Sequence, residues 1–151
     1  MIDQLIKHRD RMLPVSIGIV YLWFGFLKFF SGMSPAEALA KETLSLLTFG
    51  LVPASVSYFV LAIWEVTIGI FLLFNFQKKL IIHLALIHIL FTFTPLFLLP
   101  SLSFNHNLYS LSLAGQYIIK NLVIFSALLY VYPEKQKADV PQKTLSGILN
   151  R

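Results

Sequence analysis

Cysteine is absent from this chain of 151 residues, and charged residues make up only 13% of it. The lack of cysteine excludes disulfides, Cys-ligated zinc, thioether-bound haem and Cys-ligated iron–sulfur clusters within the chain. Roughly a quarter of the residues in a soluble domain are charged, whereas this chain is 57% hydrophobic and contains 14 phenylalanines. The composition therefore predicts an integral membrane protein with one domain and little mass outside the bilayer.

Four apolar segments are long enough to cross a bilayer. The expected fold class is all-α, an integral membrane four-helix bundle over residues 1–132. Between the first two spans, residues 35–48 are too few and too charged to cross, so we expect a short interfacial helix there. Ser34 as N-cap, with Glu37 three residues later, is typical of a capping box at the start of that helix. The expected spans are about 14–31, 55–76, 80–99 and 113–132.

The basic residues flank the apolar segments mainly on one side of the expected membrane. The N-terminus, the Lys78-Lys79 turn and the tail at 133–151 are basic. The loops after the first and third spans carry only Lys41, if Lys28 lies within its helix. Cytoplasmic loops carry an excess of lysine and arginine, so both termini are expected to be cytoplasmic. These flanks, which contact anionic lipid, account for the net charge of +5, so the charge does not indicate nucleic-acid binding.

Small and polar residues share one face of the first expected span. Two glycines on such a face allow another helix to approach closely. In the third span, Pro95 predicts a kink near the outer end of the helix. The face of the first span, at spacings of three, four and three residues, consists of Gly18, Tyr21, Gly25 and Lys28.

Ionisable residues within the apolar spans are the main functional signal, because such a group needs a partner, a water-filled cavity or a ligand. Counting about 1.5 Å per residue from the outer helix ends places Lys28 roughly 5 Å deep and Lys120 roughly 10 Å deep. Glu65 and His88, counted in the same way, lie roughly 16 Å deep. All four belong to the outer half of the membrane, on faces that we expect to turn inward. We therefore predict a charged ligand-binding pocket formed by Lys28, Glu65, His88 and Lys120, with Tyr21, Thr92, Gln116 and Asn121 in support.

Each charged residue also has a structural interpretation. Lys28 could extend its amine to the outer head groups, and His88 could be a hydrogen-bonded core residue. Glu65 and Lys120 could form an ion pair that fixes the register of two helices. In the functional interpretation, the pocket keeps a spare positive charge and receives an anion or the carbonyl oxygens of a quinone, with His88 as a proton relay. No metal site is expected, because His83 and His88 are spaced i, i+5, which suits neither a shared metal nor a haem edge.

Three short motifs, in order along the chain, resemble the DoxX-like family of small four-helix bacterial membrane proteins. The resemblance covers about residues 12–132. The motifs are Gly-x-x-Lys-Phe near the end of helix one, a Glu followed by a Gly in helix two, and Gly-x-x-x-x-Lys-Asn in helix four. They fall here on Gly25, Lys28 and Phe29, on Glu65 and Gly69, and on Gly115, Lys120 and Asn121.

The resemblance implies a protein of the bacterial inner membrane that acts as an accessory subunit of a quinone-linked redox system. Family members of this kind look like subunits of a quinone-linked oxidase or a thiosulfate:quinone oxidoreductase, and others act in redox stress or as membrane chaperones. The expected cofactor is a quinone, and the expected partners are the lipid bilayer and either a redox protein or further copies of the chain. A non-catalytic scaffold or assembly factor is the alternative. A small-solute or lipid transporter would need an oligomer, because the chain is too short for inverted repeats.

Overall fold

The computed structural model describes residues 2–76, 78–105, 107 and 109–133. The predicted tail therefore lies, except for its first residue, outside the described residues. Within the described ranges the secondary structure is helical, apart from an isolated bridge between Phe104 and Leu111. The helices are α1 (Ile2–Leu27), α2 (Glu37–Leu47), α3 (Ala54–Leu73), α4 (Lys78–Thr92), α5 (Pro95–Leu98), α6 (Pro100–Ser103) and α7 (Leu113–Val131).

Three helical stretches are long and apolar enough to cross a membrane, and the expected all-α fold class is confirmed to this extent. The apolar part of α1, Arg11–Leu27, is a fourth and shorter apolar helix. The first span was expected to reach residue 31, but α1 ends at Leu27 and the chain then turns through residues 28–32. The three long stretches are Ala54–Leu73, Lys79–Leu98 and Leu113–Val131.

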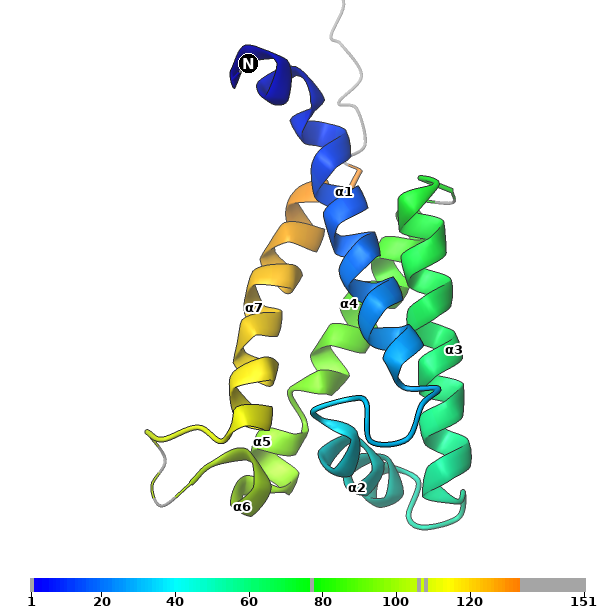
Figure 1. The fold of residues 1–151 in the computed structure, drawn as a ribbon, viewed down its shortest axis with the longest axis vertical. Coiled ribbons are helices and arrows are strands. Elements are labelled where there is room, and N and C mark those ends of the chain that lie inside the picture. Colours follow the sequence, from blue (N-terminus) through cyan, green and yellow to red (C-terminus); the bar gives the residue numbers. More distant parts are fainter. Residues whose placement is uncertain (1, 77, 106, 108, 134–151) are drawn as a thin grey trace, which may run out of the picture.

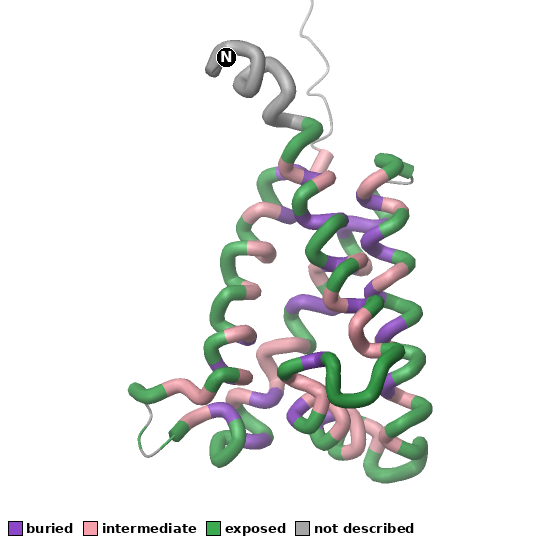
Figure 2. Tube along the Cα trace, in the orientation of Figure 1, coloured by how far each residue is buried: buried purple, intermediate pink, exposed green. Residues whose placement is uncertain are grey.

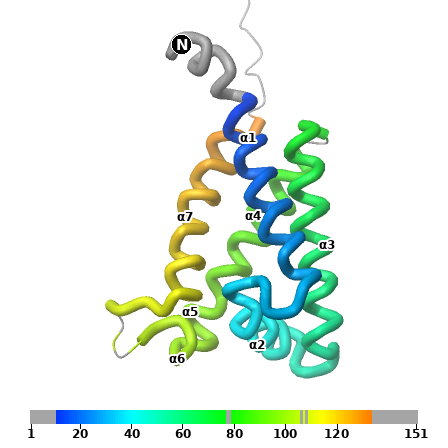
Figure 3. Tube along the Cα trace, viewed as in Figure 1, coloured from blue at the N-terminus to red at the C-terminus, as the bar shows by residue number. Residues whose placement is uncertain are grey.

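Four of the helices, α1, α3, α4 and α7, run along one another in alternating directions (Figure 1). The start of α1, the α3–α4 turn and the end of α7 lie at one end of the molecule, and α2, α5 and α6 lie at the other (Figures 1 and 3). α1 packs most extensively against α3, and α4 packs against α7. Both ends of the described chain are thus on one side, as the charge pattern predicts; which side of a membrane this is stays a prediction.

The close contact between α1 and α3 depends on glycine. A Cβ atom at Gly69 would lie 2.6 Å from the backbone nitrogen of Leu22 and 2.9 Å from the carbonyl oxygen of Gly18. A Cβ atom at Gly25 would lie 2.9 Å from Cβ of Glu65. These separations are shorter than van der Waals contact, so only glycine fits at either position. The close helix approach expected at the glycine face of α1 is confirmed, and its partner is α3.

The buried residues follow the inward faces of α1, α3, α4 and α7 (Figure 2). The outward faces are apolar as well, and Trp23 and Val123 are exposed by 65% and 72%. A helix that is apolar on all sides is typical of a membrane span, which agrees with the length and composition of these helices. The centre of the core consists of Ile17, Tyr21, Ile68, Leu72, Ile82, Ala85 and Leu128.

A helix is present within the expected range 35–48 as α2, and its place at a membrane interface stays a prediction. The predicted capping box is wrong. The N-cap is Ala36, and no side chain caps the helix. The Glu37 carboxylate instead accepts a hydrogen bond from the backbone N–H of Gly32 (2.7 Å) and one from Lys41 Nζ (2.6 Å). The Glu37 side chain therefore bonds to Gly32 in the loop before α2, and not to Ser34 as the capping box would require. At the other end Gly50, with φ at +71°, donates its N–H to the carbonyl oxygen of Ser45 and ends the helix.

Low pH should reduce the folding stability of the protein, in part because the Glu37 carboxylate becomes protonated. The hydrogen bonds from Lys41 and then from Gly32 hold the pKa of the Glu37 carboxyl below its ordinary value. A lowered folded-state pKa contributes stability that is complete above the unfolded-state pKa and is lost as the pH falls through the folded-state pKa. We expect the fall in melting temperature below about pH 4.3 to be smaller in Glu37→Gln than in the wild type. Glu42→Gln, at an exposed glutamate of the same helix, should retain the wild-type pH profile, and an equal loss of pH dependence in both variants would contradict this role of Glu37.

The expected third span at 80–99 is interrupted rather than continuous. α4 ends at Thr92 and α5 begins at Pro95, because proline has no N–H for the helix and its ring collides with the preceding turn. The expected polar loop at 100–112 also differs, since its first residues form α6. This short helix lies against α7, where Gly115 faces the carbonyl oxygen of Ser103 too closely for any Cβ atom.

Candidate ligand-binding pocket

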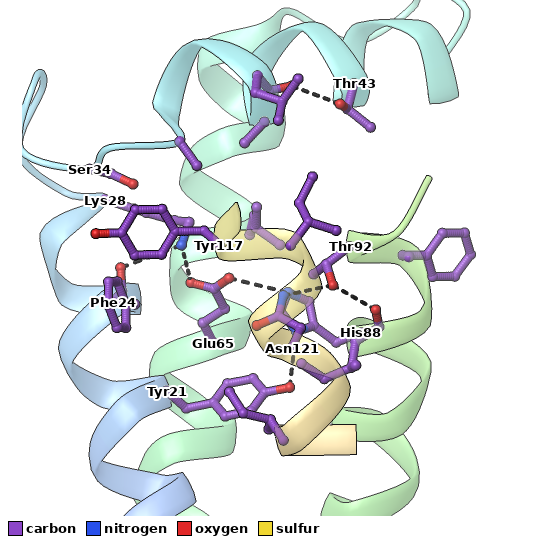
Figure 4. Close-up of a pocket in the computed structure, with 18 of the residues that line it drawn as sticks. Tyr21, Phe24, Lys28, Ser34, Thr43, Glu65, His88, Thr92, Tyr117 and Asn121 are labelled. Atoms are coloured by element: carbon purple, nitrogen blue, oxygen red, sulfur yellow. Dashed lines mark hydrogen bonds and ion pairs between the residues drawn. The ribbon is translucent and has the colours of Figure 1, made fainter. Parts of the chain in front are cut away.

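A cavity of about 500 Å³ lies between α1, α2, α4 and α7, with α3 at its base (Figure 4). This volume is within the range of small-molecule sites, which span roughly 300–1,000 Å³. Most of its wall is apolar, including Leu39, Ile89 and Ile118. Polar side chains from α3, α4 and α7, together with Lys28 after α1, meet at one part of this wall. An apolar cavity with a few converging polar groups is the usual form of a binding site.

Lys28 and Glu65 form the central contact of the pocket. Nζ of Lys28 lies 2.5 Å from Oε2 of Glu65, and the two side chains are 10% and 9% exposed. Lys28 also donates to the carbonyl oxygen of Phe24 at 3.4 Å. Because Gly25 has no side chain, the backbone of α1 can approach Glu65 closely enough for this pair to form. Lys28 therefore turns inward, and the alternative of an amine extended to the head groups is not what the structure shows.

His88 lies on the other side of the same carboxylate. Its Nε2 is 3.2 Å from Oε1 of Glu65, an ion-pair distance, but the ring N–H is not aligned with the oxygen, so this is not a formed hydrogen bond. Its Nδ1 is 3.1 Å from the hydroxyl of Tyr21, which is also 3.2 Å from the carbonyl oxygen of Ala85. Tyr21 has one proton to give to either acceptor. When it gives this proton to Nδ1, the neutral ring carries its own proton on Nε2, which faces the carboxylate.

The polar groups thus form a continuous series from Lys28 through Glu65 and His88 to Tyr21. Burying an isolated charge costs several kcal/mol, and a close partner of opposite sign offsets much of that cost. Glu65 is the residue that joins the series, because each of its two oxygens faces a different side chain (Figure 4). The arrangement connects α1, α3 and α4 and leaves only one negative charge between a lysine and a histidine.

Lys120 lines the same pocket from α7, but the predicted pairing of Lys120 with Glu65 is wrong. Among the described residues, the carboxylate meets Lys28 and His88 instead. Nζ of Lys120 lies 5.1 Å from the centre of the Tyr117 ring, a cation–π distance. Lys120 is exposed and makes no ion pair within the part of the chain that the structure describes. That Lys120 is the spare positive charge of the pocket stays a prediction.

Three of the four supporting residues lie at the pocket and one does not. Tyr21 contacts His88 as described, and Asn121 donates from Nδ2 to Oγ1 of Thr92 at 2.9 Å, linking α7 to α4. Gln116 is exposed, does not line the cavity, and its Nε2 reaches the carbonyl oxygen of Leu111 at 3.4 Å. Gln116 lies in the first turn of α7, where the loop before the helix offers the nearer partner.

The pocket also contains residues that were not among the expected site residues. Phe24 and Tyr117 meet edge to face, with ring centres 6.2 Å apart. Their helical spacing from the two lysines, four residues before Lys28 and three before Lys120, is a signal that could have identified them. The contribution of α2, including Thr43, has no comparable signal, because it depends on how the α1–α2 loop folds back over the other helices.

His83 lies far from this site, at the opposite end of α4. Its Nδ1 is 2.8 Å from the carbonyl oxygen of Lys79, and its Nε2 is 3.2 Å from the hydroxyl of Tyr132. The expectation that it does not belong to the charged pocket is confirmed. No group of three histidine, aspartate or glutamate side chains within the described ranges is arranged to hold a metal ion.

Comparisons with known proteins yield no relative for this chain. No family model, no curated protein and no solved structure matches it. The resemblance to the DoxX-like family therefore depends on the three short motifs alone. Five residues of these motifs, Gly25, Lys28, Glu65, Lys120 and Asn121, line the pocket or lie against one of its residues.

Proposed function

We propose that this protein is a multi-pass protein of the bacterial inner membrane that holds a quinone in its charged pocket, as an accessory subunit of a quinone-linked redox system. In this proposal α1, α3, α4–α5 and α7 cross the bilayer as a four-helix bundle, α2 lies at the outer interface, and both termini are cytoplasmic. The observation that carries the proposal is the 500 Å³ apolar cavity with lysine, carboxylate, imidazole and amide groups gathered on one part of its wall.

The pocket offers hydrogen-bond donors to the two carbonyl oxygens of a quinone. The Lys120 ammonium has no carboxylate partner among the described residues, and Nδ2 of Asn121 uses one of its two hydrogens for Thr92. Nε2 of His88 is buried and has no aligned acceptor. The aliphatic and aromatic side chains around these donors suit a flat ring. The chain has no cysteine to ligate a redox centre, so in this proposal electrons come from a partner protein and this chain positions the quinone.

A scaffold or assembly factor is the second candidate, and one observation favours it. The Lys28–Glu65 pair is closed and buried, and it joins the end of α1 to α3 beside the close contact of Gly25 with Glu65. Such a pair can serve helix register alone. In this case the cavity would be a consequence of packing, and a partner protein would be the ligand.

Binding of decylubiquinone to the purified protein in lipid nanodiscs tests the proposal. We expect saturable binding of a radiolabelled sample above the background of empty nanodiscs. Lys120→Met should weaken it by about tenfold or more, because a hydrogen bond from a charged donor contributes about 1.5–3 kcal/mol. Lys41→Met is the matched control, since Lys41 pairs with Glu37 on α2 and does not line the cavity. Binding that does not saturate, or that is equal in Lys120→Met and the wild type, would contradict the proposal.

A further inference from the structure

The pocket is lined by residues of α1, α2, α3, α4 and α7, and some of them, such as Phe91 and Leu47, also belong to the exposed surface of the molecule. α3 and α4 form its base and one wall, and α2 lies over one end. Between α1 and α7, however, two lining residues belong to the outer surface: Val20 is 37% exposed and Val123 is 72% exposed. The cavity therefore reaches the outer face of the molecule at a place where the surface is aliphatic, which water does not favour.

This opening has defined limits along the two helices. Towards the start of α1, Ile17 and Leu128 belong to one buried cluster that fills the space between α1 and α7. Towards α2, the Phe24 and Tyr117 rings meet edge to face across the same two helices. Val20 and Val123 lie between these contacts. The opening is thus a window between α1 and α7 bounded by packed side chains at both ends.

Polarity changes across the cavity in one direction. The side chains of Lys28, Glu65 and His88 are largely buried, whereas Val20 and Val123 are exposed at the window. Lys120 and Asn121 precede Val123 on α7 by less than one turn, so donors stand close to the inner edge of the window. A ligand that matches this order has a head that accepts hydrogen bonds and a long apolar tail.

We infer that the pocket takes a tailed amphipath directly from the bilayer, with its head at the Lys120 and Asn121 donors and its tail passing between Val20 and Val123 into the lipid. The inference rests on the proposed function in so far as a quinone is one such molecule, and it adds the tail and its route. A long-chain carboxylate shares the chemistry of an acceptor head on an apolar tail. The experiment below distinguishes a quinone from a long-chain carboxylate as the ligand.

Photolabelling tests where the tail lies. The probes are a decylubiquinone and a palmitate, each with a diazirine on its tail close to the head, and labelling counts only where excess unlabelled ligand of the same kind removes it. The inference predicts competed labels on the α1 and α7 residues around Val20 and Val123. Competed labels from either probe on α2, between Leu39 and Leu47, would overturn the window while leaving binding in place.

The two probes distinguish the window from the proposed function. Competed labelling at the window by the quinone supports both. Competed labelling there by palmitate but not by the quinone supports the window and overturns the quinone proposal. If neither probe gives competed labels, both are overturned.

Closing the window provides an independent test, which the natural absence of cysteine makes simple. Val20→Cys and Val123→Cys can be joined by a thiol crosslinker that contains a reducible disulfide. We expect joining to lower the rate of uptake of the labelling probe at least tenfold, and reduction to restore it. The matched control joins Ile63→Cys to Ile70→Cys, both on the exposed face of α3, and should leave uptake unchanged. Equal uptake in the joined and reduced states of the Val20–Val123 pair would overturn the route.

Discussion

Replacing Lys28 by methionine should lower the stability of this protein far more than replacing Lys41 by methionine. Lys28 is 10% exposed and its loss would leave the Glu65 carboxylate buried with only His88 beside it. Removing one partner of a buried ion pair costs about 3–5 kcal/mol. Lys41 is 36% exposed and pairs with Glu37 one helical turn away, and exposed pairs of this kind contribute little. Thermal unfolding in one detergent, followed by circular dichroism, measures both variants.

The double variant Lys28→Met/Glu65→Leu distinguishes the cost of leaving one buried charge unpaired from the contribution of the ion pair itself. An apolar pair of similar volume often restores or exceeds the original stability, since neither charge is then buried. We expect the double variant to recover most of the melting temperature lost in Lys28→Met. Recovery together with unchanged decylubiquinone binding would mean that the pair stabilises the fold and takes no part in binding. A Lys28→Met variant as stable as Lys41→Met would contradict the buried pair itself.

Gly69→Ala should separate α1 from α3 and give the second large effect. The added Cβ atom would meet the backbone nitrogen of Leu22 at 2.6 Å and the carbonyl oxygen of Gly18 at 2.9 Å. Backbone atoms cannot move aside as a flexible side chain can, so the helices must shift. Overpacking of this kind costs typically about 1–3 kcal/mol and sometimes more. The loss should appear as a lower melting temperature.

The matched control for Gly69→Ala is Thr67→Ala on the exposed face of the same helix. Thr67 donates its hydroxyl hydrogen only to the carbonyl oxygen of Ile63 within its own helix, and alanine has the higher helix propensity. Thr67→Ala should therefore be neutral or slightly stabilising. Because the glycine contact positions α1 at Glu65, Gly69→Ala should also weaken decylubiquinone binding. A Gly69→Ala protein with wild-type stability would show that α1 and α3 are not as close as described.

The approximate helix positions and the inward residues followed from the sequence, because both depend on local periodicity. Hydrophobic length located α3 and α7 to within a few residues, and the spacing of Gly18 and Gly25 indicated a close helix contact. Pro95 marked the break between α4 and α5 for a local steric reason. These features need no knowledge of which helix lies beside which.

The partner of Glu65 could not be predicted in this way, because two lysines at similar depth were available. The choice depends on the distance between helices, and glycine contacts bring α1, with Lys28, closest to α3. The predicted start of α2 was wrong for a similar reason. The Glu37 carboxylate accepts a hydrogen bond from the N–H of Gly32, and the position of this loop residue cannot be predicted from helix-capping patterns. The role of α2 in covering the pocket also depends on that loop.

Native mass spectrometry of the protein, extracted gently from its own membrane, tests most directly the claim that the charged pocket binds a hydrophobic small molecule. The same sample should be extracted with organic solvent to identify what is bound. The expected result is one quinone per chain, present in the wild type and in Lys41→Met and lost in Lys120→Met. A wild-type chain that carries a partner protein and no small molecule would contradict the claim and leave the buried charges with a purely structural role.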